Sequence, residues 1–164
     1  MDILFLLLKG LIMLPVVWLL MFITIFFHEM GHVVMYVLFY RENNWTVDLG
    51  IGNFKLIRIG RFTIYLNMLC GYARCNITKG YNKLSSIMLC SGGFFVNLFF
   101  VILLWICLQN IDFGTNNFLR WCVNFLFYSN LFQFLGTIIP MTIGNYSSDG
   151  MWVLRNLRGE FDED

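Results

Sequence analysis

Charged residues are scarce in this sequence. Only 13% of its 164 residues are Asp, Glu, Lys or Arg, against about 25% in a typical soluble domain, while 59% are hydrophobic. This balance excludes an ordinary water-soluble enzyme and a disordered chain, and the length allows a single domain, 1–164. The formal net charge of +1 gives no broad basic surface, so we expect no nucleic-acid partner. The composition predicts an integral membrane protein surrounded by a lipid bilayer.

A cysteine framework and a secretory leader are also missing. The cysteines are odd in number, and no two have the C-x-x-C spacing of a thiolate metal site. We interpret them as small apolar side chains of a reduced protein. The chain starts without the basic segment and the small-residue cleavage site of a signal peptide, so we expect no cleaved leader. The five cysteines are Cys70, Cys75, Cys90, Cys107 and Cys122.

Three apolar blocks are long enough to cross roughly 30 Å of hydrocarbon as helices. The first block is too long for one straight crossing, and Pro15 is expected to break it, which leaves residues 3–14 as a shallow lead-in. The sequence therefore predicts an all-α polytopic membrane protein with three core transmembrane helices. The expected helices are 15–40, 85–108, 118–140 and, at the C-terminus, a short one at 149–158.

A small antiparallel β-meander is expected at 46–67, between the first two helices. Three short runs there are rich in β-branched and aromatic residues, and two-residue turns are expected at Gly52-Asn53 and Gly60-Arg61. Because the runs are apolar, the meander is expected to dip toward the bilayer, where protein or water must shield its backbone. A hairpin on the membrane surface is the alternative.

The segments between the helices differ in charge. Residues 41–84 contain seven Lys or Arg and two acidic residues, whereas residues 109–117 contain no Lys or Arg. Positive loops stay on the cytoplasmic side, so 41–84 is expected inside and 109–117 outside. The N-terminus is then outside and the C-terminus cytoplasmic.

Both histidines of the chain lie in the string His28-Glu29-Met30-Gly31-His32. On a helix, residues four apart share a face, so both imidazoles can bind one metal ion while Glu29 activates a water molecule. The string lies within an apolar helix, where ionisable groups are costly and usually functional. A polar cluster that only joins helices is the alternative. The pattern predicts the metal pair and the general base of a zinc hydrolase.

A catalytic zinc site normally has three protein ligands, and a third histidine is lacking, so the remaining ligand must be a carboxylate or a thiolate. Glu42 is about 15 Å further along the first helix, and Asp112 is expected on the outer side. Asp149 is the predicted ligand because Gly150 allows close backbone approach there. Two alternatives stay open, namely that Asp149 only caps the last helix and that Asp48 of the meander is the ligand.

Together these motifs resemble the site-2 protease family of intramembrane zinc metalloproteases. The resemblance rests on His28 to His32 in the first core helix and on Asp149-Gly150 after the third, and it extends over about residues 15–157. Leu69-Cys70-Gly71-Tyr72 resembles the element that follows the family's β-segment. Ser91-Gly92-Gly93 with Asn97 resembles its second-helix pattern. The family's Asn-Pro before the aspartate is absent here.

The resemblance implies a small stand-alone zinc metalloendopeptidase in a bacterial cell membrane. It implies one Zn²⁺ per chain, held by His28, His32 and Asp149, with Glu29 as general base. The substrate would be a membrane-embedded or membrane-proximal peptide or protein. Asn97 would either hydrogen-bond the substrate carbonyl and developing oxyanion or only bond a neighbouring helix. The alternative function is a non-proteolytic membrane protein that binds zinc or grips a peptide in an export or assembly complex. A partner subunit or a second copy of the chain is left open in either case.

The charge asymmetry can be tested by cysteine labelling. In a cysteine-free variant, Thr115→Cys is expected to react with a membrane-impermeant maleimide from outside, and Thr78→Cys only after permeabilisation. The opposite pattern of labelling would reverse the predicted orientation.

Overall fold

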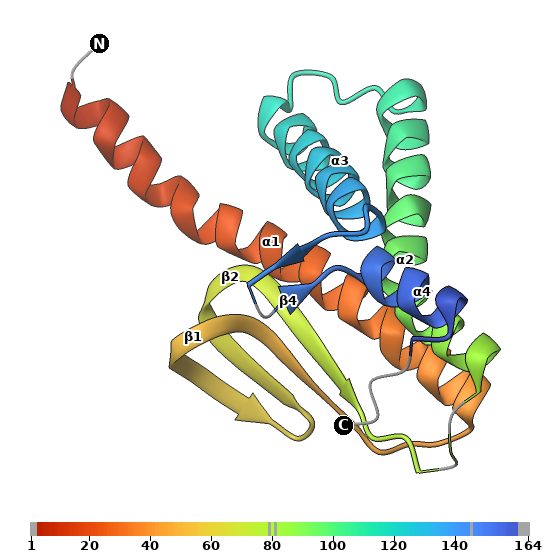
Figure 1. Ribbon diagram of the computed structural model, residues 1–164. Helices are drawn as coiled ribbons and strands as arrows, with labels where there is room; N and C mark the ends of the chain where they lie inside the picture. The colour runs from red at the N-terminus through yellow and green to blue at the C-terminus, as the bar shows by residue number, and fades with distance from the viewer. Residues whose placement is uncertain (1–2, 79, 81, 145, 161–164) are drawn as a thin grey trace.

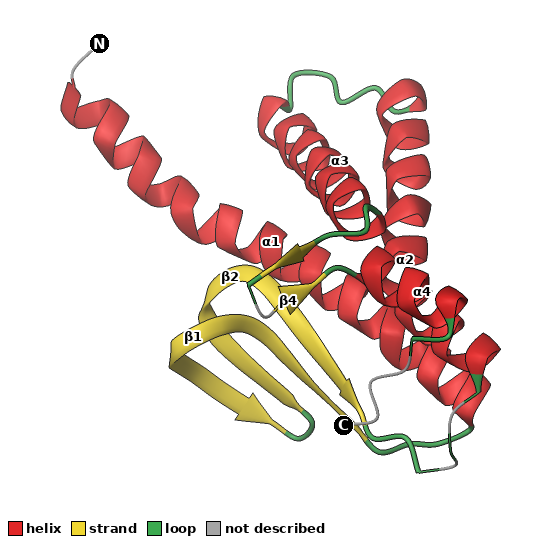
Figure 2. Ribbon diagram, in the orientation of Figure 1, coloured by secondary structure: helices red, strands yellow, loops and turns green. Residues whose placement is uncertain are grey.

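The rest of the fold is built around one 38-residue helix, α1 (Ile3–Tyr40). This computed structural model describes residues 3–78, 80, 82–144 and 146–160. Helices α2 (Lys83–Asn110) and α3 (Asn117–Ile138) form a hairpin that packs on α1, mainly through α2 (Figure 1). The short helix α4 (Asp149–Arg158) packs against α2. The described chain is mostly helical, with two antiparallel strand pairs (Figure 2).

Helix α1 continues through Pro15, so the break expected there is absent. Proline removes one backbone hydrogen bond, and within an apolar helix the remaining bonds keep the segment helical because an alternative partner is lacking. The other three helices begin and end within two residues of the predicted ranges. Asn82 and Asn116 cap the starts of α2 and α3 by accepting hydrogen bonds from backbone N–H groups.

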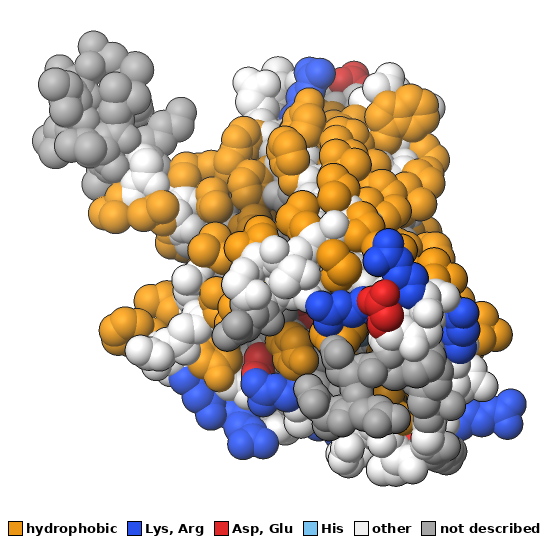
Figure 3. Space-filling view, viewed as in Figure 1, with side chains coloured by type: hydrophobic (Ala, Val, Ile, Leu, Met, Phe, Trp, Pro, Cys, Tyr) orange, Lys and Arg blue, Asp and Glu red, His pale blue; other side chains and the backbone are white. Residues whose placement is uncertain are grey.

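Two of the described helices are long and apolar enough to cross a membrane, Gly10–Tyr40 of α1 and Lys83–Asn110. Helix α3 has the length but carries polar residues at Asn124, Asn130 and Gln133, which lower its hydropathy. The third crossing therefore stays a prediction. Apolar side chains cover the α2–α3 hairpin, whereas Lys and Arg gather around the sheet and α4 (Figure 3).

The expected meander contains two long strands instead of three short ones. Strand β1 (Trp45–Ile59) continues through Gly52-Asn53, where a turn was expected. Gly50 and Gly52 have φ of +87° and +109°, values open to glycine, so the strand bends there without ending. The turn at Gly60-Arg61 forms as predicted and leads into β2 (Phe62–Cys75).

The bend curls the sheet. Val47 is paired with Ala73 near the end of β2 and also with Phe62 at its start, so the first part of β1 lies between the two ends of β2. The inner face of this curl packs on α1, and the indole N–H of Trp18 donates to the carbonyl of Leu66 at 2.7 Å. The buried apolar core comprises Ile25, Val33, Val47, Leu49 and Met68.

Helices α1 and α2 touch backbone to backbone where they cross. A Cβ on Gly31 would collide with the carbonyl of Gly92, and a Cβ on Gly92 would collide with the carbonyl of Gly31 and lie 2.8 Å from the backbone nitrogen of His32. Two glycines facing each other therefore set the separation of the helices. Backbone atoms cannot swing aside, so larger residues would push the helices apart.

We expect Gly92→Ala to destabilise the fold by about 1–3 kcal/mol, because overpacking at a backbone contact forces the helices to shift. Thermal unfolding in detergent is the measurement. Gly136→Ala in α3 is the matched control, since its Cβ would meet open space and alanine favours a helix. An equal effect of both substitutions would contradict a dominant role for the crossing.

Candidate metal centre

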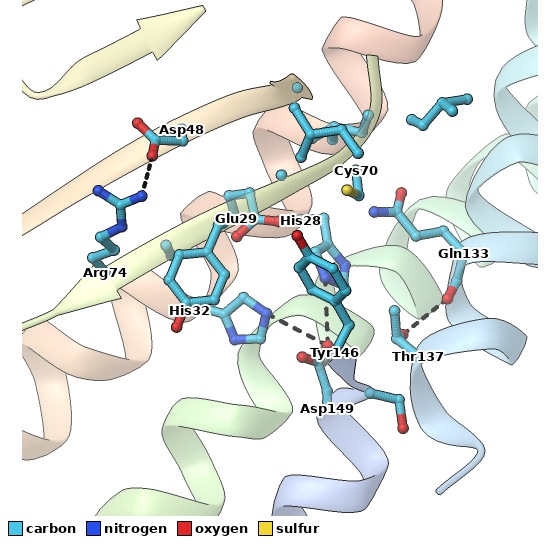
Figure 4. Close-up of a pocket in the computed structure, with 18 of the residues that line it drawn as sticks. His28, Glu29, His32, Asp48, Cys70, Arg74, Gln133, Thr137, Tyr146 and Asp149 are labelled. Atoms are coloured by element: carbon cyan, nitrogen blue, oxygen red, sulfur yellow. Dashed lines mark hydrogen bonds and ion pairs between the residues drawn. The ribbon is translucent and has the colours of Figure 1, made fainter. Parts of the chain in front are cut away.

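Three predicted ligands lie together at the centre of the molecule. His28 and His32 are one turn apart on α1, and their Nε2 atoms lie 3.4 and 3.5 Å from Oδ2 of Asp149 (Figure 4). The candidate ligand atoms of the three residues are all within 4.8 Å of one another. All three side chains are largely buried. The arrangement can hold one metal ion.

The chain brings Asp149 to the histidines by a tight reversal after α3. Strands β3 (Thr142–Ile143) and β4 (Tyr146–Ser147) form a two-residue ladder. Gly150 then packs against the end of α3, where a Cβ would collide with the carbonyl of Ile138. Asp149 is thereby fixed at the first residue of α4.

The N-cap of α4 is Ser148, not Asp149. Its hydroxyl accepts from the backbone N–H of Met151 at 3.2 Å and donates to the carbonyl of Ile139 at 2.7 Å. The capping position is thus filled by another side chain, and the carboxylate of Asp149 faces the imidazoles. The capping alternative does not account for Asp149.

The environment of Asp149 suits a metal ligand. Its Oδ2 is buried, and apart from the two imidazoles at 3.4 and 3.5 Å it has no polar partner among the described residues. Burial raises the pKa of Asp149, but interactions with His28 and His32 outweigh it and hold the pKa below its usual range. A bound cation would satisfy this buried oxygen better than these long contacts do.

Groups on α2 orient both imidazoles. Nδ1 of His32 lies 2.8 Å from the carbonyl of Leu89 and donates to it, so that a neutral ring carries its lone pair on Nε2. Nδ1 of His28 lies 3.0 Å from the amide nitrogen of Asn97, whose buried Oδ1 has no partner. An amide turned so that Oδ1 accepts from Nδ1–H satisfies both groups. The lone pairs of both Nε2 atoms then point to the same place as the carboxylate of Asp149, where a metal ion could bind.

Asn97 lies behind His28 and does not line the cavity. Its side chain is fully buried, on the side of the imidazole that carries Nδ1. Of the two roles considered for Asn97, the structure shows the contact with a neighbouring helix, and the role toward a substrate stays a prediction. It is placed as a positioning residue for His28.

Two glycines make room for the polar groups. A Cβ on Gly93 would lie 2.5 Å from Nε2 of both His28 and His32. A Cβ on Gly71 in β2 would lie 2.7 Å from Oε1 of Glu29. Larger side chains at either position would displace an imidazole or the carboxylate.

Glu29 is buried beside the three candidate ligands His28, His32 and Asp149, which we call the metal group, but is not one of them. It points toward β2, next to Gly71, and the backbone of Ala73 is within hydrogen-bonding reach. A carboxylate in this position can take up a proton from a water molecule near the metal.

The other carboxylates considered as ligands are engaged elsewhere. Asp48 is paired with Arg74 at 2.7 Å on the sheet, Glu42 accepts from the hydroxyl of Tyr36, and Asp112 accepts from the backbone N–H of Gly114. The five cysteines are free thiols, and burial, followed by the charge of Glu29, raises the pKa of Cys75 to about 12. The donor set of two histidines and one aspartate fits Zn²⁺.

A cavity of about 1490 Å³ opens onto the metal group. Its walls come from α1, both long strands, α2, α3 and the turn before α4. Gln133 and Thr137, one turn apart on α3, line it. Tyr146 of β4 was not foreseen, because sequence alone does not show that this short strand borders the same cavity as Asp149 (Figure 4). Side chains from distant segments thus surround one hollow.

No family model, curated protein or solved structure matches this chain.

The identity of the third ligand can be tested by Asp149→Asn. Because a neutral amide oxygen is a poor zinc ligand, we expect zinc affinity to fall by more than about tenfold from a one-to-one complex. The measurement is competition with a chromogenic chelator. Asp112→Asn, in the α2–α3 loop, is the control and should bind zinc as the wild type does. Unchanged affinity in Asp149→Asn would remove Asp149 from the ligand set.

Proposed function

We propose that this chain is an integral membrane zinc metalloprotease similar to the site-2 protease family, which hydrolyses a peptide bond of a membrane-embedded or membrane-proximal polypeptide. One observation carries the proposal. His28, His32 and Asp149 converge, with Glu29 beside them, at the wall of a cavity large enough for a polypeptide segment. Three protein donors and an adjacent carboxylate are the parts of a hydrolytic zinc site.

A membrane location is supported by the exposed apolar surface. On α2, Phe99, Ile102 and Trp105 are each more than half exposed, and no described segment covers them. Soluble proteins rarely leave so extensive an apolar surface in water. We place α1, α2 and α3 across the bilayer, with the N-terminus outside and the C-terminus in the cytoplasm of a bacterial cell.

In the proposed reaction a bound ion would supply Lewis acidity, polarising the scissile carbonyl and lowering the pKa of water. His28, His32 and Asp149 would hold it, with Leu89 and Asn97 keeping the imidazoles in their binding tautomer. Glu29 takes the proton from the attacking water and passes it to the leaving amine.

Strand β2 offers a place for the substrate backbone. Its last part is paired with β1 along one edge, from Gly71 to Cys75, and no described strand pairs with the other edge there. Gly71 is in contact with Glu29, so that edge borders the reacting groups. A substrate added to it as a further strand would be held extended, which hydrolysis of a helical segment requires.

Glu29→Gln separates a protease from a protein that only binds zinc or grips a peptide. We expect the variant to keep its zinc and to lose at least about 10²-fold in cleavage, because the amide cannot accept the proton. Purified protein in liposomes is incubated with a pool of single-span peptides, and mass spectrometry detects the products. Glu160→Gln, an exposed site near the end of α4, is the matched control.

Equal cleavage by Glu29→Gln and the wild type would exclude Glu29 as the base. Zinc binding by a wild type that cleaves no peptide in the pool would favour the non-proteolytic alternative.

A further inference from the structure

The curled sheet carries a second, strongly basic hollow of about 220 Å³. Four cationic side chains line it together with hydroxyl groups of Thr and Tyr residues, and Asp48 is its only acidic residue. The cations are Lys55, Arg58, Arg61 and Arg74. Four positive charges against one negative charge leave a net +3, in a chain whose total charge is +1.

Much of this charge is uncompensated. Asp48 is already paired with Arg74 at 2.7 Å, and Arg61 donates to the side-chain oxygen of Asn43. Within the described ranges, no side-chain hydrogen bond or ion pair engages Lys55 or Arg58, whose backbones pair with β2. Concentrated cations in a hollow attract an anionic group, and guanidinium groups bind carboxylates with paired hydrogen bonds.

The basic hollow adjoins the cavity beside His28, His32 and Asp149. Thr46, Asp48, Tyr65 and Arg74 line both. Figure 4 shows the Asp48–Arg74 pair beside β2. A polypeptide that occupies the metal cavity can therefore reach the basic hollow with its side chains.

We propose that the basic hollow binds acidic side chains of the polypeptide whose backbone lies in the metal cavity. This selectivity rests on the proposed function, because it concerns the substrate of that site. Gly71 touches Glu29, and Arg74 is three residues further along the same strand, about 10 Å at the rise of an extended chain. A substrate paired along β2 therefore carries its acidic residues about three positions from the cleaved bond.

Peptide carboxylates fit the hollow better than the phosphates of membrane lipids. The hollow shares four lining residues with the metal cavity, so one extended polypeptide can contact both. Binding to an anionic bilayer would depend on the outer surface alone and would not need this connection.

The test measures binding, using the Glu29→Gln chain loaded with zinc in phosphatidylcholine nanodiscs. The fluorescent single-span peptides share a fixed central sequence. They differ only at two positions, one about three residues before its centre and one about three residues after it, which are both Asp, both Asn or both Lys. By anisotropy, we expect the Asp-Asp peptide to bind about tenfold more tightly than the Asn-Asn peptide, with the advantage shrinking as salt is added. The Lys-Lys peptide should bind most weakly.

Replacing both Lys55 and Arg58 by Gln should abolish the preference for Asp-Asp and leave zinc content unchanged. The control replaces Arg120 and Arg158 by Gln, which removes the same charge outside the hollow and should keep the preference. Equal binding of the Asp-Asp and Asn-Asn peptides, or equal effects of the two double variants, would overturn the proposal.

Two further results separate this proposal from its alternatives. Loss of the preference in nanodiscs containing phosphatidylglycerol, at unchanged salt, would overturn it by assigning the hollow to lipid headgroups. If the protein binds acidic peptides selectively but cleaves none, the role of the basic hollow is supported and only the proposed protease activity is contradicted. If the wild type cleaves peptides without charge selectivity, the protease activity is supported and the role of the basic hollow is contradicted.

Discussion

The backbone contact between Gly31 and Gly92 is the constraint on which the centre of this protein depends. It brings α2 close enough to α1 for the carbonyl of Leu89 to reach His32 and for the amide of Asn97 to reach His28. Helix α1 supplies the imidazoles, and hydrogen-bonding groups on α2 orient their nitrogen atoms. If the helices crossed further apart, these hydrogen bonds would be lost and the two Nε2 atoms would no longer be held toward one point.

A second constraint acts at the other end of the chain. The turn after α3 satisfies the start of α4 with Ser148, so Asp149 is left for the histidines. Gly150 permits this because its hydrogen sits where a side chain would strike α3. Of these two neighbouring residues, Ser148 therefore caps α4 and Asp149 completes the metal group.

The sequence predicted those features that depend on neighbouring residues. The pair His28 and His32 follows from helical spacing, and the helix limits follow from apolar runs and caps. The unbroken helix at Pro15 and the continuous strand at Gly52 were not predicted, because surrounding contacts decide whether such residues end an element. Nor could spacing reveal that Asn97 supports His28, since that contact depends on how two helices cross.

The position of the cluster has a consequence for the stability of the whole chain. Residues 28 and 149 are 121 positions apart, and a metal ion shared between them would act as a cross-link that closes most of the polypeptide into one loop. The described cysteines form no disulfide, so among the described residues such an ion would be the only cross-link that closes so long a loop. Long loops lose the most entropy on closure in the unfolded state, and binding to the folded state adds further stabilisation. A chelator should therefore loosen the tertiary structure well beyond the residues that touch the ion.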